Sequence, residues 1–303
     1  MKKSMISLAL AGLLILAGGV LFVCTMFTLH WDFSKLSTKE YETNTYEISE
    51  DFHSITINTD TADILFVLSS DGRCRVECYE ETNANHAVAA KDGTLTIDLA
   101  EEKTVADAIC NIGINIGSPK LTVYLPQAEY TALVIREDTG DIHLPADFCF
   151  DSVDLALNTG DVSCFASVSG QMKIKTTTGD IRVEDVSADA LDLTVSTGDV
   201  RLENIRCNTL RTSGNTGDLL LKNVIAREAI SITRTTCDVR FDGADAAAIF
   251  VETDTGDVTG SLLSEKQFLP QSDTGDIEVP QTISGGKCEI TTSTGDIRLE
   301  VAQ

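Results

Sequence analysis

The sequence has few basic residues and no cluster of them. It contains 23 lysines and arginines against 47 aspartates and glutamates, which gives a formal net charge of −24. Because no run of Lys or Arg is present to neutralise phosphates, the chain is not expected to bind nucleic acid. The same imbalance disfavours electrostatic docking on an anionic membrane face and suits a soluble surface that attracts cations.

Sequence motifs of common catalytic and metal sites are also missing. The four histidines, His30, His53, His86 and His143, are isolated, and the chain has no HExxH, no CxxC and no nucleophile elbow. We therefore do not expect an enzyme, and no catalytic residue is predicted. A carbohydrate-active β-helix enzyme that uses clustered aspartates stays open as an alternative.

A long hydrophobic run occurs only at the N-terminus, and helical periodicity is absent beyond it. Residues 4–29 are uncharged and follow Lys2 and Lys3. This run exceeds the roughly 20 residues that span a bilayer. We therefore predict a membrane anchor at 1–30 and a linker at 31–44, with the lysines cytoplasmic and the rest extracytoplasmic. A cleaved signal peptide, cut near residues 17–19 or near Cys24, is the alternative.

The rest of the chain carries a repeated Thr-Gly-Asp turn. The turn occurs nine times, once with Cys in place of Gly, at intervals of 19 or 20 residues. So constant a period predicts a solenoid. The nine aspartates are Asp141, Asp161, Asp180, Asp199, Asp218, Asp238, Asp257, Asp276 and Asp296.

Apolar residues alternate with polar ones on both sides of each turn, which predicts two short strands per rung with one aliphatic face. The Gly suits a turn position with positive φ, and the Asp caps the turn. We predict an all-β fold, a β-solenoid over 45–303, irregular at 45–126 and regular at 127–303. Residues 61–64 (TADI) look like a degenerate copy four rungs before Asp141, and the last rung, IRLEVAQ, is expected to be the open edge.

The cysteines are predicted to be free. Cys149 and Cys207 lie three rungs apart, and Cys74 and Cys78 are too distant along one extended strand to form a disulfide. Most of the cysteines are therefore expected to act as small core residues. Cys237 is the exception, because it replaces the Gly of one turn and is predicted to be exposed and reactive.

The column of aspartates can be a scaffold or a cation site. An arginine two residues after the Asp, as in Arg182 and Arg201, is expected to neutralise the column. Where this Arg is missing, DTGDV at 254–258 and DTGDI at 273–277 are expected to stack directly on each other. Ca2+ prefers six to eight oxygen ligands, so this stack predicts a candidate Ca2+ site formed by Asp254, Asp257, Asp273 and Asp276. No other cofactor is predicted.

Together, the anchor, HSITINTDTADILFVLSS at 53–70, TLTIDL at 94–99, LTVYLP at 121–126 and the tandem TGD rungs resemble one bacterial family. This is the "putative adhesin" family, also called the toastrack superfamily of envelope proteins. The resemblance implies an extracytoplasmic, solenoid-like β domain tethered by one helix, and no catalytic residues. We expect an interaction module of the cell envelope, for adhesion or envelope-stress sensing. Its partner would be another envelope protein, a cell-wall polymer or a cationic peptide.

Overall fold

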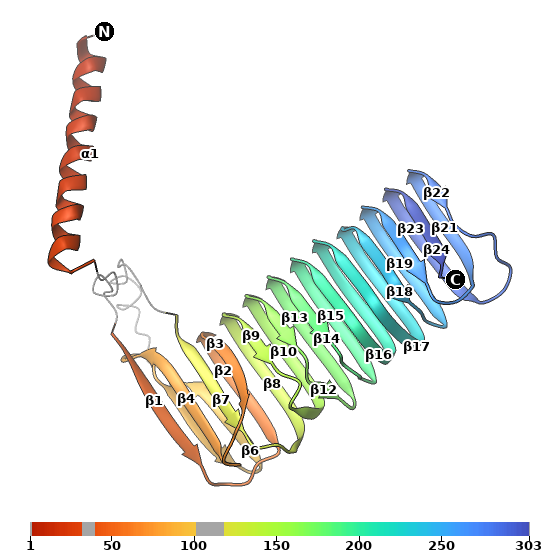
Figure 1. Cartoon of the computed structure of the whole chain (residues 1–303), viewed down its shortest axis with the longest axis horizontal. Coiled ribbons are helices and arrows are strands. Elements are labelled where there is room, and N and C mark those ends of the chain that lie inside the picture. Colours follow the sequence, from red (N-terminus) through yellow and green to blue (C-terminus); the bar gives the residue numbers. More distant parts are fainter. Residues whose placement is uncertain (1, 32–39, 101–117, 303) are drawn as a thin grey trace.

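The computed structural model describes residues 2–31, 40–100 and 118–302. In this part of the chain one helix, α1 (Lys2–Thr28), stands apart from a β-solenoid of about eight turns (Figure 1). Its segment Ala11–Thr28, with a mean hydropathy of 2.2, is long and apolar enough to cross a membrane. Most of the predicted linker, at 32–39, lies outside the described residues, and its end at 41–44 is already part of a strand.

The regular part of the solenoid has two main walls of parallel strands joined by the TGD turns. The wall before the turns contains the longer strands. They are β8 (Glu129–Thr139), β10 (Cys149–Thr159), β13 (Gln171–Thr178), β15 (Ala190–Thr197), the second halves of β16 (Val200–Thr216) and β17 (Leu219–Thr236), β19 (Ala248–Thr255), β21 (Lys266–Thr274) and β23 (Gly286–Thr294).

The wall after the turns contains the shorter strands. They are β9 (Ile142–Leu144), β11 (Val162–Cys164), β14 (Ile181–Glu184), the first halves of β16 and β17, β18 (Val239–Ala244), β20 (Val258–Leu262), β22 (Ile277–Glu278) and β24 (Ile297–Val301). A two-residue strand, β12 (Ser167–Val168), pairs with β10.

A second corner gives the central rungs a third side, which the sequence pattern did not predict. Asp185, Asn204 and Asn223 stack at this corner with φ of +57°, +55° and +51°. Asn and Asp tolerate this left-handed conformation better than other non-glycine residues. The Asn204 side-chain amide donates to Asp185 (2.8 Å), and the Asn223 amide donates to Asn204 (2.8 Å). The chain then forms a short third side, where Ser187 bridges to Arg206.

The predicted inward columns form one aliphatic core. The residue after each TGD aspartate is at most 1% exposed in eight rungs, whereas Ile277 is 46% exposed. Full burial of such a side chain stabilises the fold by about 1.5–3 kcal/mol, so stacked columns supply most of the stability. The buried members are Ile142, Val162, Ile181, Val200, Leu219, Val239, Val258 and Ile297.

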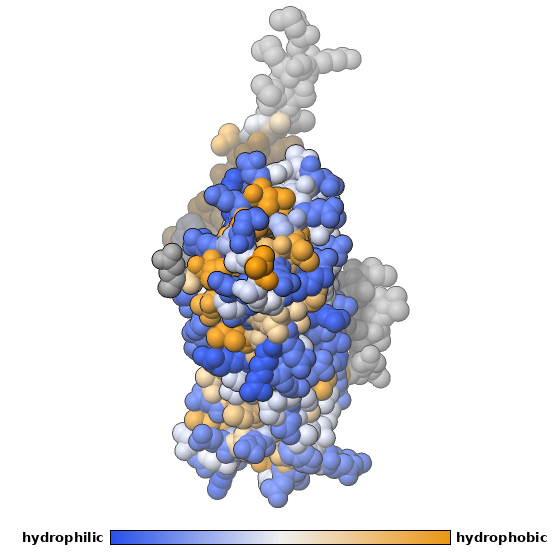
Figure 2. Space-filling model, turned by 90° about the vertical axis from the view of Figure 1, so that its right-hand side faces the viewer, coloured by the Kyte–Doolittle hydropathy of each residue, from blue (hydrophilic) through white to orange (hydrophobic). Residues whose placement is uncertain are grey.

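The exposed Ile277 marks an unexpected order of the last rungs. β19 pairs with β23, and β23 pairs with β21, so the β23–β24 rung lies between the two that precede it in sequence (Figure 1). The prediction that the last rung is the open edge is therefore wrong: β21 and β22 form it. Pro270 lies in β21, where a residue without an N–H suits an edge strand. Figure 2 faces this end and shows hydrophobic side chains on it, and the exposed ones include Leu269 and Ile283.

The N-terminal end is built from strands β1 to β7. β2 (Ser54–Thr61) and β3 (Asp63–Leu68) pair directly with β8 and β9, so the TADI copy lies one rung before Asp141 and not four. The intervening segment contributes β4 (Cys74–Glu81), β5 (His86–Lys91), β6 (Thr94–Leu99) and β7 (Lys120–Leu125). β4 runs antiparallel to both β7 and β1 (Tyr41–Ile48), and β5 runs antiparallel to β6.

The described cysteines are free, as predicted, but Cys237 is neither exposed nor strained. It is 2% exposed and has no positive φ. This turn therefore has a different backbone conformation from the turns that contain Gly, and it is not strained. Burial raises the pKa of the Cys237 thiol to about 11. Because the thiolate is the reactive form, this thiol is expected to be inert in the folded protein.

We expect a maleimide reagent to label Cys149 in the native protein and to leave Cys237 unmodified. Cys149 is exposed, whereas Cys237 is buried. Peptide mass spectrometry after labelling the full chain in detergent measures this, and the same reaction in denaturant is the positive control. Labelling of Cys237 at a rate similar to that of Cys149 would show that its turn opens readily.

Candidate functional site

The TGD aspartates form a hydrogen-bonded column, which we call the aspartate ladder. Oδ1 of each member accepts the backbone N–H of the aspartate in the next rung, at 2.7–3.2 Å. The ladder begins at Asp63, one rung before Asp141, and ends at Asp276, which donates to Asp296. These bonds to an ionised acceptor hold neighbouring rungs in register. The ladder aspartates therefore have a structural role in holding the rungs together, in addition to any role in binding.

The glycines of the same turns are required by close stacking. They have φ between +122° and +153° in the eight rungs that contain Gly. A Cβ on Gly198 would lie 2.1 Å from the carbonyl oxygen of Gly179 in the adjacent rung. Only Gly combines this backbone conformation with this approach.

Two central arginines of the short-strand wall, Arg182 and Arg201, pair with glutamates and not with the ladder. Arg182 makes two hydrogen bonds to Glu184, of 2.6 and 2.9 Å, and Arg201 bonds to Glu203 at 3.1 Å. Lys222 also donates to Glu203, at 2.6 Å. Hydrogen bonds from Lys222 and then Arg201 lower the pKa of the Glu203 carboxyl. The prediction that Arg182 and Arg201 neutralise the ladder is therefore wrong.

Because the central arginines are engaged elsewhere, the central ladder carboxylates keep their charge facing solvent. Within the described residues no ion pair forms to Asp161, Asp180 or Asp199. The ion pair from Arg298 to Asp296, at 2.7 Å, lies near the C-terminal end. The central ladder is thus a row of exposed negative charges fixed in position by their backbone partners.

Between the ladder and the side chains two residues after each ladder aspartate runs a shallow depression, which we call the charged groove. One part, of about 420 Å³, is lined on one side by Asp161, Asp180, Asp199 and Asp218 and on the other by Ser163, Arg182, Arg201 and Leu220. A second part, of about 580 Å³, continues past Asp218 and Asp238 to Arg240, Asp242 and Thr259. The groove therefore crosses six rungs, and each of the first five contributes a ladder aspartate to it.

The four aspartates predicted to bind Ca2+ do not come together. Asp257 is in the rung of β19 and β20, and Asp276 is in that of β21 and β22, with the rung of Asp296 between them. Oδ1 of Asp257 accepts from Asp296, which in turn accepts from Asp276. Asp254 and Asp273 precede the same two separated turns. The stacking on which the site was predicted is absent.

A different group of metal-ligand side chains was missed from the sequence. Cys78, Glu80 and His86 have potential ligand atoms within 4.8 Å of one another, and all three residues are buried. His86 is therefore not isolated in the fold. The one signal was the alternation in β4, which puts Cys78 and Glu80 on the same face. Nothing in the spacing shows that His86 folds back onto them.

The geometry defines a class of protein: a parallel β-solenoid whose rungs are linked by the hydrogen bonds of an aspartate ladder. It also has a charged outer groove and an apolar N-terminal helix. The chain belongs to the Toastrack DUF4097 family, whose model matches residues 52–235 and 203–303. The resemblance drawn from the sequence and the predicted β-solenoid are thus confirmed.

Solved structures from Bacteroides and Parabacteroides species match most of the chain at low sequence identity. A "putative adhesin" from Bacteroides fragilis is 19% identical, with a TM-score of 0.48 over 87% of this chain and 98% of that one. A "putative adhesin" from Parabacteroides distasonis is 12% identical, with a TM-score of 0.43 over 87% and 98%. A "putative lipid binding protein" from the same species is 15% identical, with a TM-score of 0.41 over 88% and 98%. No curated protein matches the chain.

Proposed function

We propose that the chain is a single-pass membrane protein of the bacterial envelope whose extracytoplasmic solenoid binds an extended cationic partner along the charged groove. The observation that carries this proposal is the row of ladder carboxylates without ion pairs, at Asp161, Asp180 and Asp199, beside arginines already paired with glutamates. The partner adds the cations that the chain itself does not supply.

The repeating geometry favours a long partner over a compact one. Adjacent parallel strands lie about 4.8 Å apart, so one groove offers the same carboxylate at each step. Each contact is exposed and therefore weak on its own. Many equivalent contacts along one polymer add up, and the net charge of −24 increases the rate of encounter with a cation. Adhesion to a cationic surface or sensing of a cationic peptide both use such a groove.

We expect the double variant Asp180→Asn and Asp199→Asn to bind an oligolysine peptide at least about threefold more weakly than the wild type at low salt. Asn retains a carbonyl oxygen that accepts the ladder hydrogen bond, and it removes the negative charge. Fluorescence anisotropy with the full chain in detergent measures binding, and both proteins should lose affinity as salt screens the groove.

The matched control is Glu228→Gln with Glu252→Gln, which removes the same charge from exposed residues outside the groove. It should bind like the wild type. Equal losses in the two double variants would show that net charge alone attracts the peptide. Absence of wild-type binding at low salt would reject a cationic partner.

A further inference from the structure

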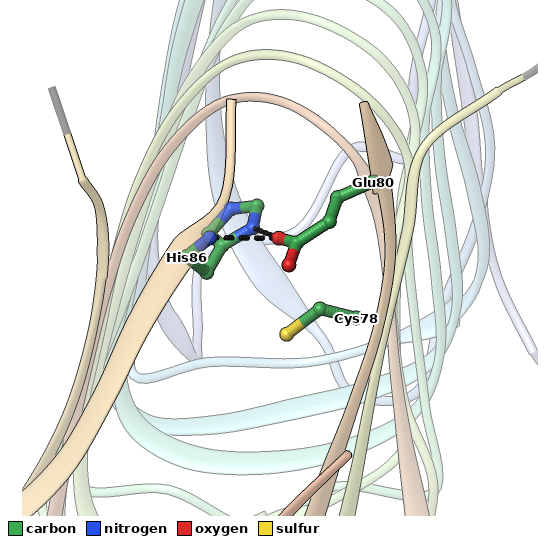
Figure 3. Close-up of side chains that lie close together, drawn as sticks. All are labelled: Cys78, Glu80 and His86. Carbon is green, nitrogen blue, oxygen red and sulfur yellow. Dashed lines mark hydrogen bonds and ion pairs between the residues drawn. The ribbon is translucent and has the colours of Figure 1, made fainter. Parts of the chain in front are cut away.

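A second site lies inside the N-terminal end of the solenoid, apart from the charged groove. Cys78 and Glu80 belong to β4, and His86 is the first residue of β5. Figure 3 shows Cys78 and Glu80 projecting from one wall and His86 projecting toward them from the opposite wall. Two walls of the fold therefore meet through three side chains that are all capable of binding a metal.

The three side chains are close together and shielded from water. Cys78 and Glu80 are each 1% exposed and His86 is 5% exposed. His86 Nδ1 lies 2.6 Å from Glu80 Oε2, and one ligand atom from each residue falls within a 4.8 Å group. In a zinc site with bonds of about 2.0–2.3 Å, ligand atoms lie roughly 3.3–3.8 Å apart. Metal binding therefore requires side-chain rotations that bring the three ligand atoms to that spacing.

Neighbouring residues hold the ligands in orientations that suit a metal. Thr59 Oγ1 lies 2.9 Å from His86 Nε2, so it can accept the proton of that nitrogen when Nδ1 is a ligand. Asn44 donates to Glu80 Oε1 at 2.7 Å, and the backbone N–H of His86 donates to Glu80 Oε2 at 2.7 Å. Such outer hydrogen bonds on His and carboxylate ligands are characteristic of metal sites.

We infer that Cys78, Glu80 and His86 form a binding site for a thiophilic divalent cation of the Zn2+ type. The ligand set contains one thiol, one imidazole and one carboxylate, which Zn2+ accepts and which Ca2+, with its preference for oxygen, does not. On binding, Cys78 releases its thiol proton, and His86 coordinates the ion through Nδ1 as a neutral imidazole whose proton is on Nε2. One thiolate and one carboxylate then balance the two charges of the ion, so the buried site is neutral.

The full chain in detergent, freed of metal with a chelator, is titrated with Co2+ and then with Zn2+. We expect one ion per chain, a thiolate-to-Co2+ charge-transfer absorption, and loss of that absorption when Zn2+ displaces Co2+. Thermal unfolding should shift upward with Zn2+, because the ion binds the folded state.

Cys78→Ser is expected to abolish the charge-transfer band and to weaken Zn2+ binding at least about 100-fold. Cys74→Ser is the matched control, because Cys74 lies on the same inner face of β4 but outside the group. It should keep the band. Glu80→Gln and His86→Gln give the same test where Cys78→Ser does not fold. Absence of Co2+ and Zn2+ binding by the wild type, or binding unchanged by all three ligand variants, would overturn the inference.

Discussion

Replacing Gly198 with alanine is expected to lower the free energy of unfolding of the solenoid by about 3–5 kcal/mol. Gly198 has φ of +144°, a conformation that costs a residue with a side chain about 1–3 kcal/mol. The new methyl group would also lie 2.1 Å from the carbonyl oxygen and 2.6 Å from the carbonyl carbon of Gly179. Because both atoms are backbone, relief requires the two rungs to move apart, which weakens the ladder bond between Asp180 and Asp199.

Urea denaturation followed by circular dichroism measures this loss. Gly72→Ala is the control, because Gly72 also has a positive φ, of +72°, but no atom within 4 Å of its added Cβ. It should cost about 1 kcal/mol, the strain of the backbone alone. The difference between the two variants reports the stacking clash.

The rung with Cys237 makes this prediction informative. Cys237 occupies the place of the glycine without adopting a positive φ, so the fold already contains one turn of another shape. A loss below about 1 kcal/mol for Gly198→Ala would show that a central turn converts to that shape at little cost. Glycine would then be favoured at this position of the turn but not required there.

The periodic part of the fold could be predicted because each rung repeats one set of constraints. The TGD turn sets the register, and alternation on either side of it places residues such as Leu191 and Leu193 inside, at 1% exposure. The turn motif and the alternation are local features of the sequence, and every rung contains both of them. The positive φ of Gly198 follows from the turn alone, whereas the bond from the Asp218 N–H to Asp199 Oδ1 joins two rungs and was not predicted.

The order of the rungs could not be predicted in the same way. The period of the sequence determines the register between two stacked rungs, but it does not determine which rungs are neighbours. The rungs of β19, β21 and β23 share the same sequence pattern, so the pattern alone does not order them. Pro270 was the available signal. A strand containing proline belongs at an edge, and this places the rung of β21 outside that of β23.

The charge pairs and the buried cluster depended on side-chain geometry. In the pattern Asp-x-Arg-x-Glu the arginine has an acid two residues away on each side. The backbone N–H of the next rung already occupies one oxygen of the Asp, and Arg182 therefore pairs with Glu184. His86 meets Cys78 through an antiparallel excursion that has no repeat, so its position follows only from the assembled fold.

The wild-type solenoid is expected to lose up to about 5 kcal/mol of stability between about pH 5 and about pH 8.5, and the variant Glu137→Gln is not. Glu137 is 5% exposed and lies in an inner column whose neighbouring rung carries Leu157. Its Oε1 accepts the backbone N–H of Ala62 at 3.1 Å, while Oε2 has no partner among the described residues. Burial, and then the nearby carboxylates of Asp63, Asp141 and Asp138, raise the pKa of Glu137 from 4.5 to about 8.

The direction of this pH effect follows from proton linkage. Between pH 4.5 and about 8 the folded chain keeps the proton on Glu137 and the unfolded chain has lost it. Stability therefore falls as pH rises through this window and levels off above it. The limit of about 5 kcal/mol is obtained from the difference between the pKa of Glu137 in the unfolded chain, 4.5, and in the folded chain, about 8. Each pKa unit corresponds to about 1.4 kcal/mol. Glutamine keeps an acceptor for Ala62 without a titrating proton, so the variant should match the wild type near pH 5 and exceed it near pH 8.5.

Urea denaturation at the two pH values measures both proteins, and Glu129→Gln, at an exposed residue on the same strand, is the control that should follow the wild type. The upper pH stays below the range in which the buried thiols, whose pKa values are raised to about 11 or 12, add a similar effect. If Glu137→Gln shows the same loss as the wild type, another group carries the pH dependence. If neither protein loses stability, Glu137 ionises inside the solenoid at no cost, which would require water or a cation beside its second oxygen.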